Sequence, residues 1–187
     1  MTAIAEGVEP QDELDSLTEA GVLCAQGFLF ARPSAPGSFE AVILQTSGLK
    51  GGISIDHAHP RWVDRVAHDF PGLRLICAHG CVPYFRELAL VTRRRPNVYA
   101  SPDLYTFLDF SACQWIQPGQ LIFASGYPFV PVERVKKTYL SAPWAGSHKL
   151  DDIMYRNAIR ALKLEHNALF ASRLKQPPVF SRNNRNA

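Results

Sequence analysis

One histidine, His79, directly follows a strongly apolar run, residues 73–78. If that run is a parallel β-strand, His79 lies at its carboxyl end, where an imidazole can bind a metal ion or transfer protons. Cys77 and Cys81 flank it at alternating positions and could form a zinc or thiol site with it. A second ligand pair at standard spacing is missing, however, so the sequence favours Cys77 as a small buried hydrophobic residue.

A second set of imidazoles lies upstream, in the pair His57 and His59. Residues at i and i+2 of a strand point to the same face, so both rings could reach one ion. Together with His79 they would supply three imidazoles, a frequent ligand set of open catalytic zinc sites. The alternative is a chance His-x-His in a loop, and the sequence favours this alternative over the metal site.

The elements that must position these residues alternate between strand and helix. Short apolar runs predict strands at residues 2–5, 22–25, 53–55, 73–78, 97–100 and 121–124. Helical spacing of apolar residues, or a proline at a helix start, predicts helices at residues 10–20, 39–44, 60–67, 84–92, 132–139 and 150–162. This alternation indicates an α/β fold, either a partial (β/α) barrel or an open parallel sheet, because five or six strands are too few for a complete TIM barrel.

The domain organisation is predicted from a glycine-rich seam at residues 46–52. It separates residues 1–45, which are acidic, from residues 53–172, and a basic tail at 173–187 is expected to be flexible. The 187 residues carry a formal net charge of +3. No nucleic-acid motif accompanies the basic residues, so we do not expect a nucleic-acid partner.

Our expectation for the cellular compartment rests on two kinds of sequence segment that we do not find. The chain has no apolar run of membrane-spanning length and no basic segment ahead of an apolar stretch at its start. We therefore expect a cytoplasmic protein with no membrane partner, in which the four cysteines stay reduced.

The first part of the chain, residues 2–45, carries the segments AEGVE at 5–9 and QGFLFARP at 26–33. In residues and spacing it resembles the C-terminal end of an EAL domain, the family of cyclic-di-GMP phosphodiesterases. The resemblance places Glu6 and Gln26 at the ends of the last two barrel strands. The other acidic residues of that family's two-metal site have no counterpart here, so phosphodiesterase activity is not expected.

Residues 59–164 carry a second set of motifs. These are DFPGLRLICAHG at 69–80, PNVY at 96–99, LIFASGYPF at 121–129 and Asn157-Ala158. They resemble the C-terminal part of the amidohydrolase-related family, metal-dependent hydrolases and decarboxylases built on a (β/α)₈ barrel. The resemblance assigns His79 to a metal-binding or substrate-activating position. It also places Gly126 where the family usually has a metal-binding aspartate, and glycine supplies no ligand.

These observations favour a metal-assisted hydrolase or decarboxylase for a small carboxylate or amide, with one divalent ion such as zinc and with His79 as ligand or acid/base group. Gly126 predicts that this site is degenerate. Two alternatives follow, a non-catalytic scaffold or assembly protein and an EAL-derived remnant that binds a cyclic dinucleotide. Open sheet edges also predict self-association.

Overall fold

The structure, a computed structural model, describes residues 4–6, 24–26, 40–48, 54–103, 111–142 and 147–180. The chain forms two compact units, Met1–Ser38 and Phe39–Ala187. The second unit therefore begins before the glycine-rich seam that the sequence suggested as a boundary. It takes in the segment from residue 39 onward, which we expected to belong to the first part.

In the first unit, two short strands lie parallel to each other. They are β1 (Ile4–Glu6) and β2 (Cys24–Gln26), and their register pairs Glu6 with Gln26 at the carboxyl ends. Both strands were expected from apolar runs. The predicted helix at residues 10–20 lies outside the described residues.

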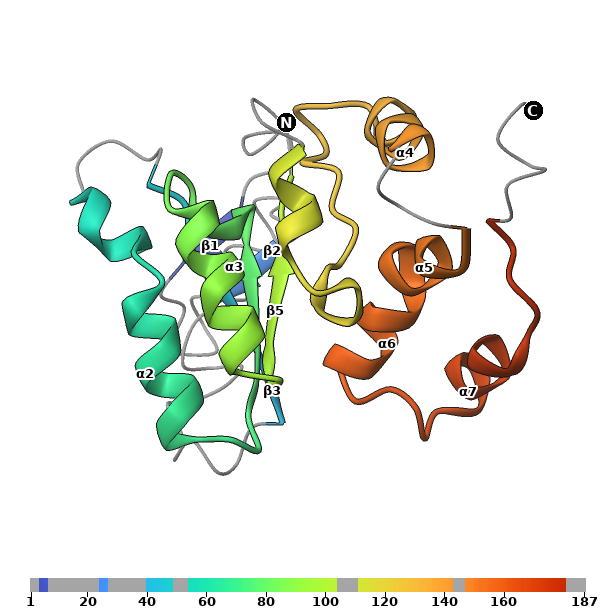
Figure 1. Ribbon diagram of the computed structural model, residues 1–187, viewed down its shortest axis with the longest axis horizontal. Helices are drawn as coiled ribbons and strands as arrows, with labels where there is room; N and C mark the ends of the chain where they lie inside the picture. Colours follow the sequence, from blue (N-terminus) through green and yellow to red (C-terminus); the bar gives the residue numbers. More distant parts are fainter. Residues whose placement is uncertain are drawn as a thin grey trace. The chain divides into compact units, whose positions relative to one another are not determined.

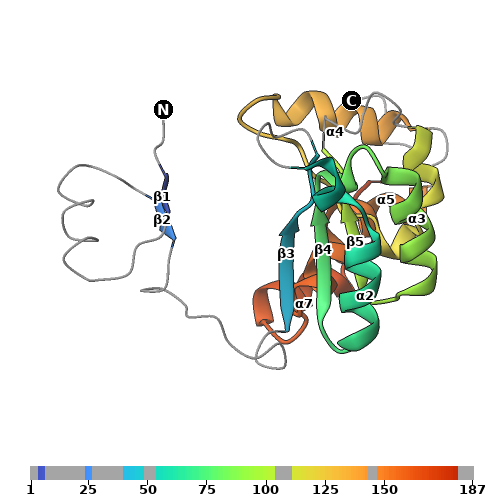
Figure 2. The ribbon, with the colours of Figure 1, turned by 90° about the vertical axis from the view of Figure 1, so that its left-hand side faces the viewer.

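The second unit is built on a parallel sheet of three strands in the order β3-β4-β5, side by side in Figure 2. The strands are β3 (Ala41–Gln45), β4 (Arg74–Ala78) and β5 (Val98–Ser101). A single parallel bridge between Ala100 and Leu121 adds a fourth segment at the β5 edge. In the described part of the chain the sheet is open, as the strand count had predicted.

Strand β3 corrects the sequence prediction of a helix at residues 39–44. Val42 and Leu44 pack against the main core, whereas Ile43 between them is 65% exposed. This alternation has the period of a strand. A short apolar run does not distinguish helix from strand by itself, and pairing with β4, which is distant in sequence, decides the conformation.

Helices cover both faces of this sheet (Figure 1). On one side lie α2 (Arg61–Asp69) and α3 (Phe85–Arg94), which bury Val63, Ala67 and Leu88 in the main core with alternate residues of β4 and β5. On the other side α6 (Asn157–Ala161) packs Ala161 against Ile76 of β4, Tyr99 of β5 and Ile122, which follows the bridge at Leu121. Strands β4 and β5 are thus buried on both faces, whereas β3 exposes Ile43.

The predicted helix at 150–162 consists of three segments. They are α5 (Ser147–Asp151), a π-helical stretch (Asp152–Arg156) and α6. The predicted helix at 132–139 is confirmed as α4 (Val132–Ser141), and α7 (Ala168–Lys175) follows α6.

Two predicted strands are corrected. Residues 121–124 contribute only the bridge at Leu121. At 53–55 no strand forms in the described residues, because Ser54 caps a 3₁₀ turn (Ile55–Ala58) by accepting a hydrogen bond from the backbone N–H of Asp56.

Buried amides fasten the connections between strands and helices. Asn97 donates through Nδ2 to the carbonyls of Ala67, Phe70 and Leu73, at 2.9–3.2 Å. Gln120 donates through Nε2 to two further carbonyls, both at 2.7 Å. These bonds supply donors to carbonyls at the end of α2, in the loop before β4 and around the start of β5. Among the described helices, none is long and apolar enough to cross a membrane.

Candidate active site

The candidate site lies at the carboxyl ends of two neighbouring strands. His79 follows the last residue of β4, and Asp103 follows β5, whose final residue Ser101 is the register partner of Ala78. The imidazole Nδ1 of His79 forms a short contact with Oδ2 of Asp103. The Asp103 side chain is 4% exposed and the His79 side chain 23% exposed. The imidazole is therefore the part of this pair that reaches the surface.

The turn that carries His79 has an unusual backbone. His79, Gly80 and Cys81 have φ values of 63°, 66° and 58°, all in the left-handed region. This region is unfavourable for residues with a Cβ, so the surroundings must hold the turn in place.

The end of β3 provides that support. Thr46 Oγ1 donates to the Ala78 carbonyl at 2.5 Å and accepts from the backbone N–H of Cys81 at 3.0 Å. Two residues further on, the N–H of Gly48 donates to the Val82 carbonyl at 2.8 Å. A Cβ on Gly48 would lie only 2.9 Å from that same carbonyl oxygen, so the close approach requires glycine. Neither Thr46 nor Gly48 was singled out by the sequence analysis.

Gly126 lies directly beside the pair. Its φ is +67°, and a Cβ built on it would lie 3.5 Å from Cβ and 3.6 Å from Oδ2 of Asp103. Position 126, where an aspartate was expected from the family resemblance, therefore adjoins a carboxylate that comes from a different strand. Sequence analysis missed Asp103, although an acidic residue just after a predicted strand was the available signal.

Tyr139 is buried beside the segment that carries Asp103. Its side chain is completely buried, and its hydroxyl donates to the carbonyl of Pro102, next to Asp103, at 3.3 Å. Burial raises the pKa of Tyr139 well above its ordinary value, and the negative charges of Cys113 and Asp103 raise that pKa further. The phenol is therefore neutral near pH 7 and can act as a donor.

The two cysteines that flank His79 form a buried thiol pair. The hydrogen bond between them raises the pKa of the Cys77 thiol, as does burial, and the same bond lowers the pKa of Cys81. Thr46 also lowers the pKa of Cys81 through a side-chain hydrogen bond. Both residues are fully buried, in accord with the interpretation of Cys77 as a core residue.

The structure does not gather the three predicted metal-binding imidazoles. His57 is exposed in its 3₁₀ turn, and the His59 ring lies against Tyr84, with 4.6 Å between ring centroids. His59 Nδ1 accepts from the backbone N–H of Arg61 at 3.2 Å. In the described part of the chain, no three histidine, cysteine or acidic side chains are grouped so that they could hold a metal ion.

Comparison with known proteins agrees with this architecture. The sequence profile of the amidohydrolase family matches residues 41–164 of the 187, more than half of the chain. The match begins at β3, within the segment that we had compared with EAL domains, and no comparison supports that earlier resemblance. None of the curated proteins matches the chain.

Among solved structures, an uncharacterised TIM-barrel protein from Bordetella bronchiseptica is similar, with a TM-score of 0.61 and 24% sequence identity. The similarity covers 87% of this chain and 66% of that protein, and at this identity it concerns the fold alone. The chain thus spans 66% of the length of this barrel protein.

Proposed function

Because this chain belongs to the amidohydrolase family, we propose that it is a hydrolase or decarboxylase for a small carboxylate or amide, with His79 as its acid/base group. The observation that carries the proposal is the contact between His79 and Asp103 at the carboxyl ends of parallel strands. Active sites of (β/α) barrels are built at this end of the strands.

Asp103 acts in this proposal as a positioning residue. Its carboxylate accepts the hydrogen on Nδ1 of His79, which fixes the tautomer in which Nε2 carries the lone pair. The negative charge also stabilises the imidazolium that forms when Nε2 takes up a proton. Because the Asp103 carboxylate is buried and the imidazole is partly exposed, the proton exchanges with substrate at the histidine.

For hydrolysis, His79 Nε2 removes a proton from water as the oxygen attacks the substrate carbonyl. The resulting imidazolium then returns that proton to the departing nitrogen or oxygen. For decarboxylation, His79 Nε2 first takes up a proton from solvent, and the imidazolium then gives that proton to the substrate carbon as its bond to the carboxylate breaks and carbon dioxide leaves. Both reactions use one proton acceptor that becomes a proton donor, which is what an imidazole held by a carboxylate provides.

Members of this family are generally metal-dependent. His79 and Asp103 provide two donors, and a catalytic zinc site has three protein ligands with one open position. The described residues do not complete such a set. We therefore derive no step through a metal ion, and the proposal assigns the proton transfers to His79.

The test compares the full-length protein with three variants on a panel of small amides, lactones and unsaturated carboxylic acids. His79→Gln and Asp103→Asn should each lower the turnover of a processed compound by about 10²–10⁴-fold, the usual contribution of a positioned acid/base group. His57→Gln, which changes an exposed histidine, should leave the rate unchanged. Turnover that survives in His79→Gln would contradict the proposal, and a folded protein without turnover would favour a non-catalytic scaffold.

A further inference from the structure

A concave region that does not include His79 lies between α6, α7 and the segment that follows α7. It is a cavity of about 560 Å³ with an almost wholly apolar lining. The lining residues are Met154, Tyr155, Ala158, Ile159, Leu162, Leu164, Phe170, Arg173, Val179 and Phe180. Its volume falls within the range of small-molecule sites, roughly 300–1,000 Å³.

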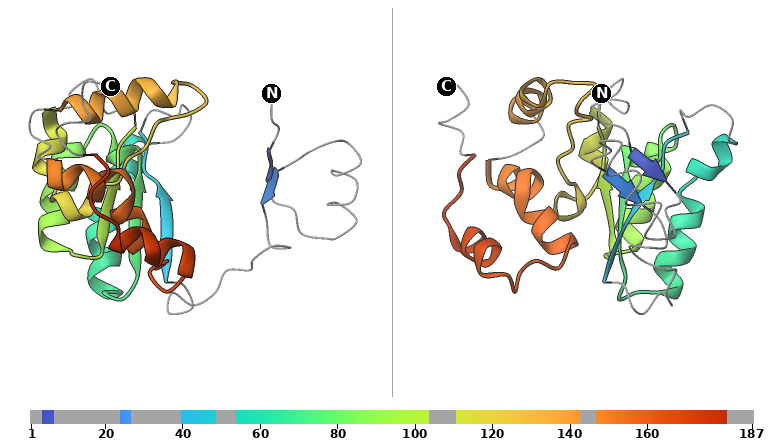
Figure 3. Two further views of the ribbon diagram at one scale, coloured as in Figure 1. Left: turned by 90° about the vertical axis from the view of Figure 1, so that its right-hand side faces the viewer. Right: turned by 180° about the vertical axis from the view of Figure 1, so that it is seen from behind.

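The two walls of this cavity have different origins. Met154, Ala158 and Leu162 are spaced four residues apart, so they form one stripe along the π-helical stretch and α6. The opposite wall comes from α7 and residues 176–180, which run back along the outer side of α5 and α6 (Figures 1 and 3). None of the residues of α7 is fully buried, so its own packing holds it only weakly.

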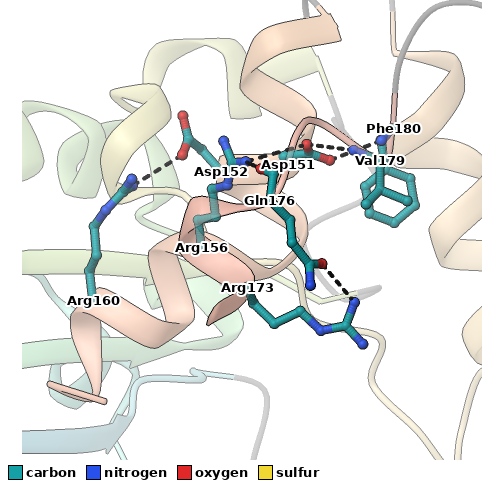
Figure 4. A network of polar contacts seen from close by, with 8 residues as sticks. All are labelled: Asp151, Asp152, Arg156, Arg160, Arg173, Gln176, Val179 and Phe180. Atoms are coloured by element: carbon teal, nitrogen blue, oxygen red, sulfur yellow. Dashed lines mark hydrogen bonds and ion pairs between the residues drawn. The ribbon is translucent and has the colours of Figure 1, made fainter. Parts of the chain in front are cut away.

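A buried carboxylate fastens this outer wall. Asp151 is completely buried, and its two oxygens accept from the backbone N–H groups of Val179 and Phe180, at 2.8 and 2.9 Å (Figure 4). Arg156 adds a bond from Nη2 to the Gln176 carbonyl at 2.8 Å. A buried carboxylate is costly unless it is hydrogen-bonded, so this arrangement specifies where the segment lies.

The charges of this network do not balance. Arg156 approaches Asp151 at 4.0 Å and Arg160 pairs with Asp152 at 3.1 Å. Arg173 instead donates from Nη1 to the neutral side-chain oxygen of Gln176 at 3.2 Å, and it has no carboxylate partner among the described residues (Figure 4). A guanidinium has five N–H donors, so this single bond leaves donors for another acceptor. The unbalanced cation of the network is therefore the one that lines the cavity.

We propose that this cavity binds one amphipathic carboxylic acid, with its hydrocarbon part on the stripe of Met154, Ala158 and Leu162 and its carboxylate on Arg173. The apolar lining selects the hydrocarbon body, and the guanidinium of Arg173, which has no carboxylate partner in the part of the chain that the structure describes, selects one negative charge. This site is separate from the His79–Asp103 pair, and the proposal does not depend on the proposed catalytic function.

Calorimetric titration of the full-length protein with decanoate, 1-decanol and decylamine tests the proposal. Decanoate should bind with a stoichiometry of one, at least tenfold more tightly than decanol, and decylamine should bind more weakly than either. Arg173→Gln should remove the preference for the acid and leave decanol binding unchanged. Arg134→Gln, which alters an exposed arginine on α4, should have no effect.

A second variant tests the apolar wall. Leu162→Trp should fill part of the cavity and weaken both decanoate and decanol at least tenfold. Leu162 is 40% exposed, so this change leaves the core intact, and circular dichroism and thermal unfolding would verify the fold. Equal affinity for the three probes, unchanged decanoate binding in Arg173→Gln, or no decanoate binding by the folded protein would each overturn the proposal.

Discussion

Gly126→Asp should create a metal site that the wild-type residues do not complete. The new side chain would start 3.5–3.7 Å from the Asp103 side chain, so both carboxylates would adjoin the His79 imidazole. Two carboxylates and one imidazole would supply the three protein ligands of an open zinc site, with the imidazole binding through Nδ1 after the metal displaces its proton. Gly126→Asn is the matched control, because asparagine has the same shape and supplies no negative charge.

The magnitudes follow from the geometry at position 126. A residue with a Cβ at φ +67° costs about 1–2 kcal/mol, and both aspartate and asparagine tolerate this region better than most residues. Two carboxylates roughly 5 Å apart repel by about 3 kcal/mol at an effective dielectric constant of about 20. Without metal, Gly126→Asn should therefore be about 1 kcal/mol less stable than the wild type, and Gly126→Asp, which adds the repulsion, about 4 kcal/mol less stable.

Urea unfolding with and without Zn²⁺ measures both effects. At a free zinc concentration of about 100 times its dissociation constant, Gly126→Asp should regain about 2.7 kcal/mol, and neither the wild type nor Gly126→Asn should change. Wild-type protein that is stabilised by zinc as strongly as Gly126→Asp would refute the reasoning. So would identical zinc responses of the aspartate and asparagine variants.

Three further changes test the surroundings of the site. Thr46→Val should destabilise the protein by about 1–3 kcal/mol, because the Cys81 N–H loses its acceptor, whereas Thr46→Ser should retain most of the stability in urea unfolding. Asn97→Ala removes the side-chain donor to the carbonyls of Ala67, Phe70 and Leu73, of which Phe70 keeps the Leu73 N–H, so the free energy of unfolding should fall by about 2–4 kcal/mol in the same assay. Burial raises the pKa of Tyr139 in the folded protein, so folding favours the protonated phenol. The contribution of this group to the free energy of unfolding is present below pH 10 and is lost as the pH rises through the raised pKa. Above pH 10 the stability of the wild type should therefore fall more steeply than that of Tyr139→Phe. Urea unfolding of both proteins at pH 8–11 measures this difference. Parallel plots of unfolding free energy against pH would contradict the prediction.

The strands and the position of His79 could be predicted because local patterns determine them. The apolar run before His79 is a buried strand in the structure, and the helices predicted at residues 60–67 and 132–139 are confirmed as α2 and α4. The prediction at residues 39–44 failed because the conformation of β3 depends on pairing with β4, which local sequence does not reveal.

The partner of His79 could not be found in the same way. Asp103 is 24 residues away along the chain, and only the parallel register of β4 and β5 brings the two side chains together. Gly126 was recognised as a missing carboxylate, but its closeness to Asp103 depends on the path of a loop. Thr46 was overlooked because its hydroxyl supports a strained turn that is visible only in three dimensions.

The tautomer of the His79 ring tests the central claim most directly. Long-range ¹H–¹⁵N correlation spectra of histidine-labelled protein distinguish the two neutral tautomers of each ring. We predict that neutral His79 carries its proton on Nδ1, and that Asp103→Asn removes this preference. His59, whose Nδ1 accepts from Arg61, provides an internal reference with the proton on Nε2. A His79 ring protonated on Nε2 and unaffected by Asp103→Asn would contradict the account.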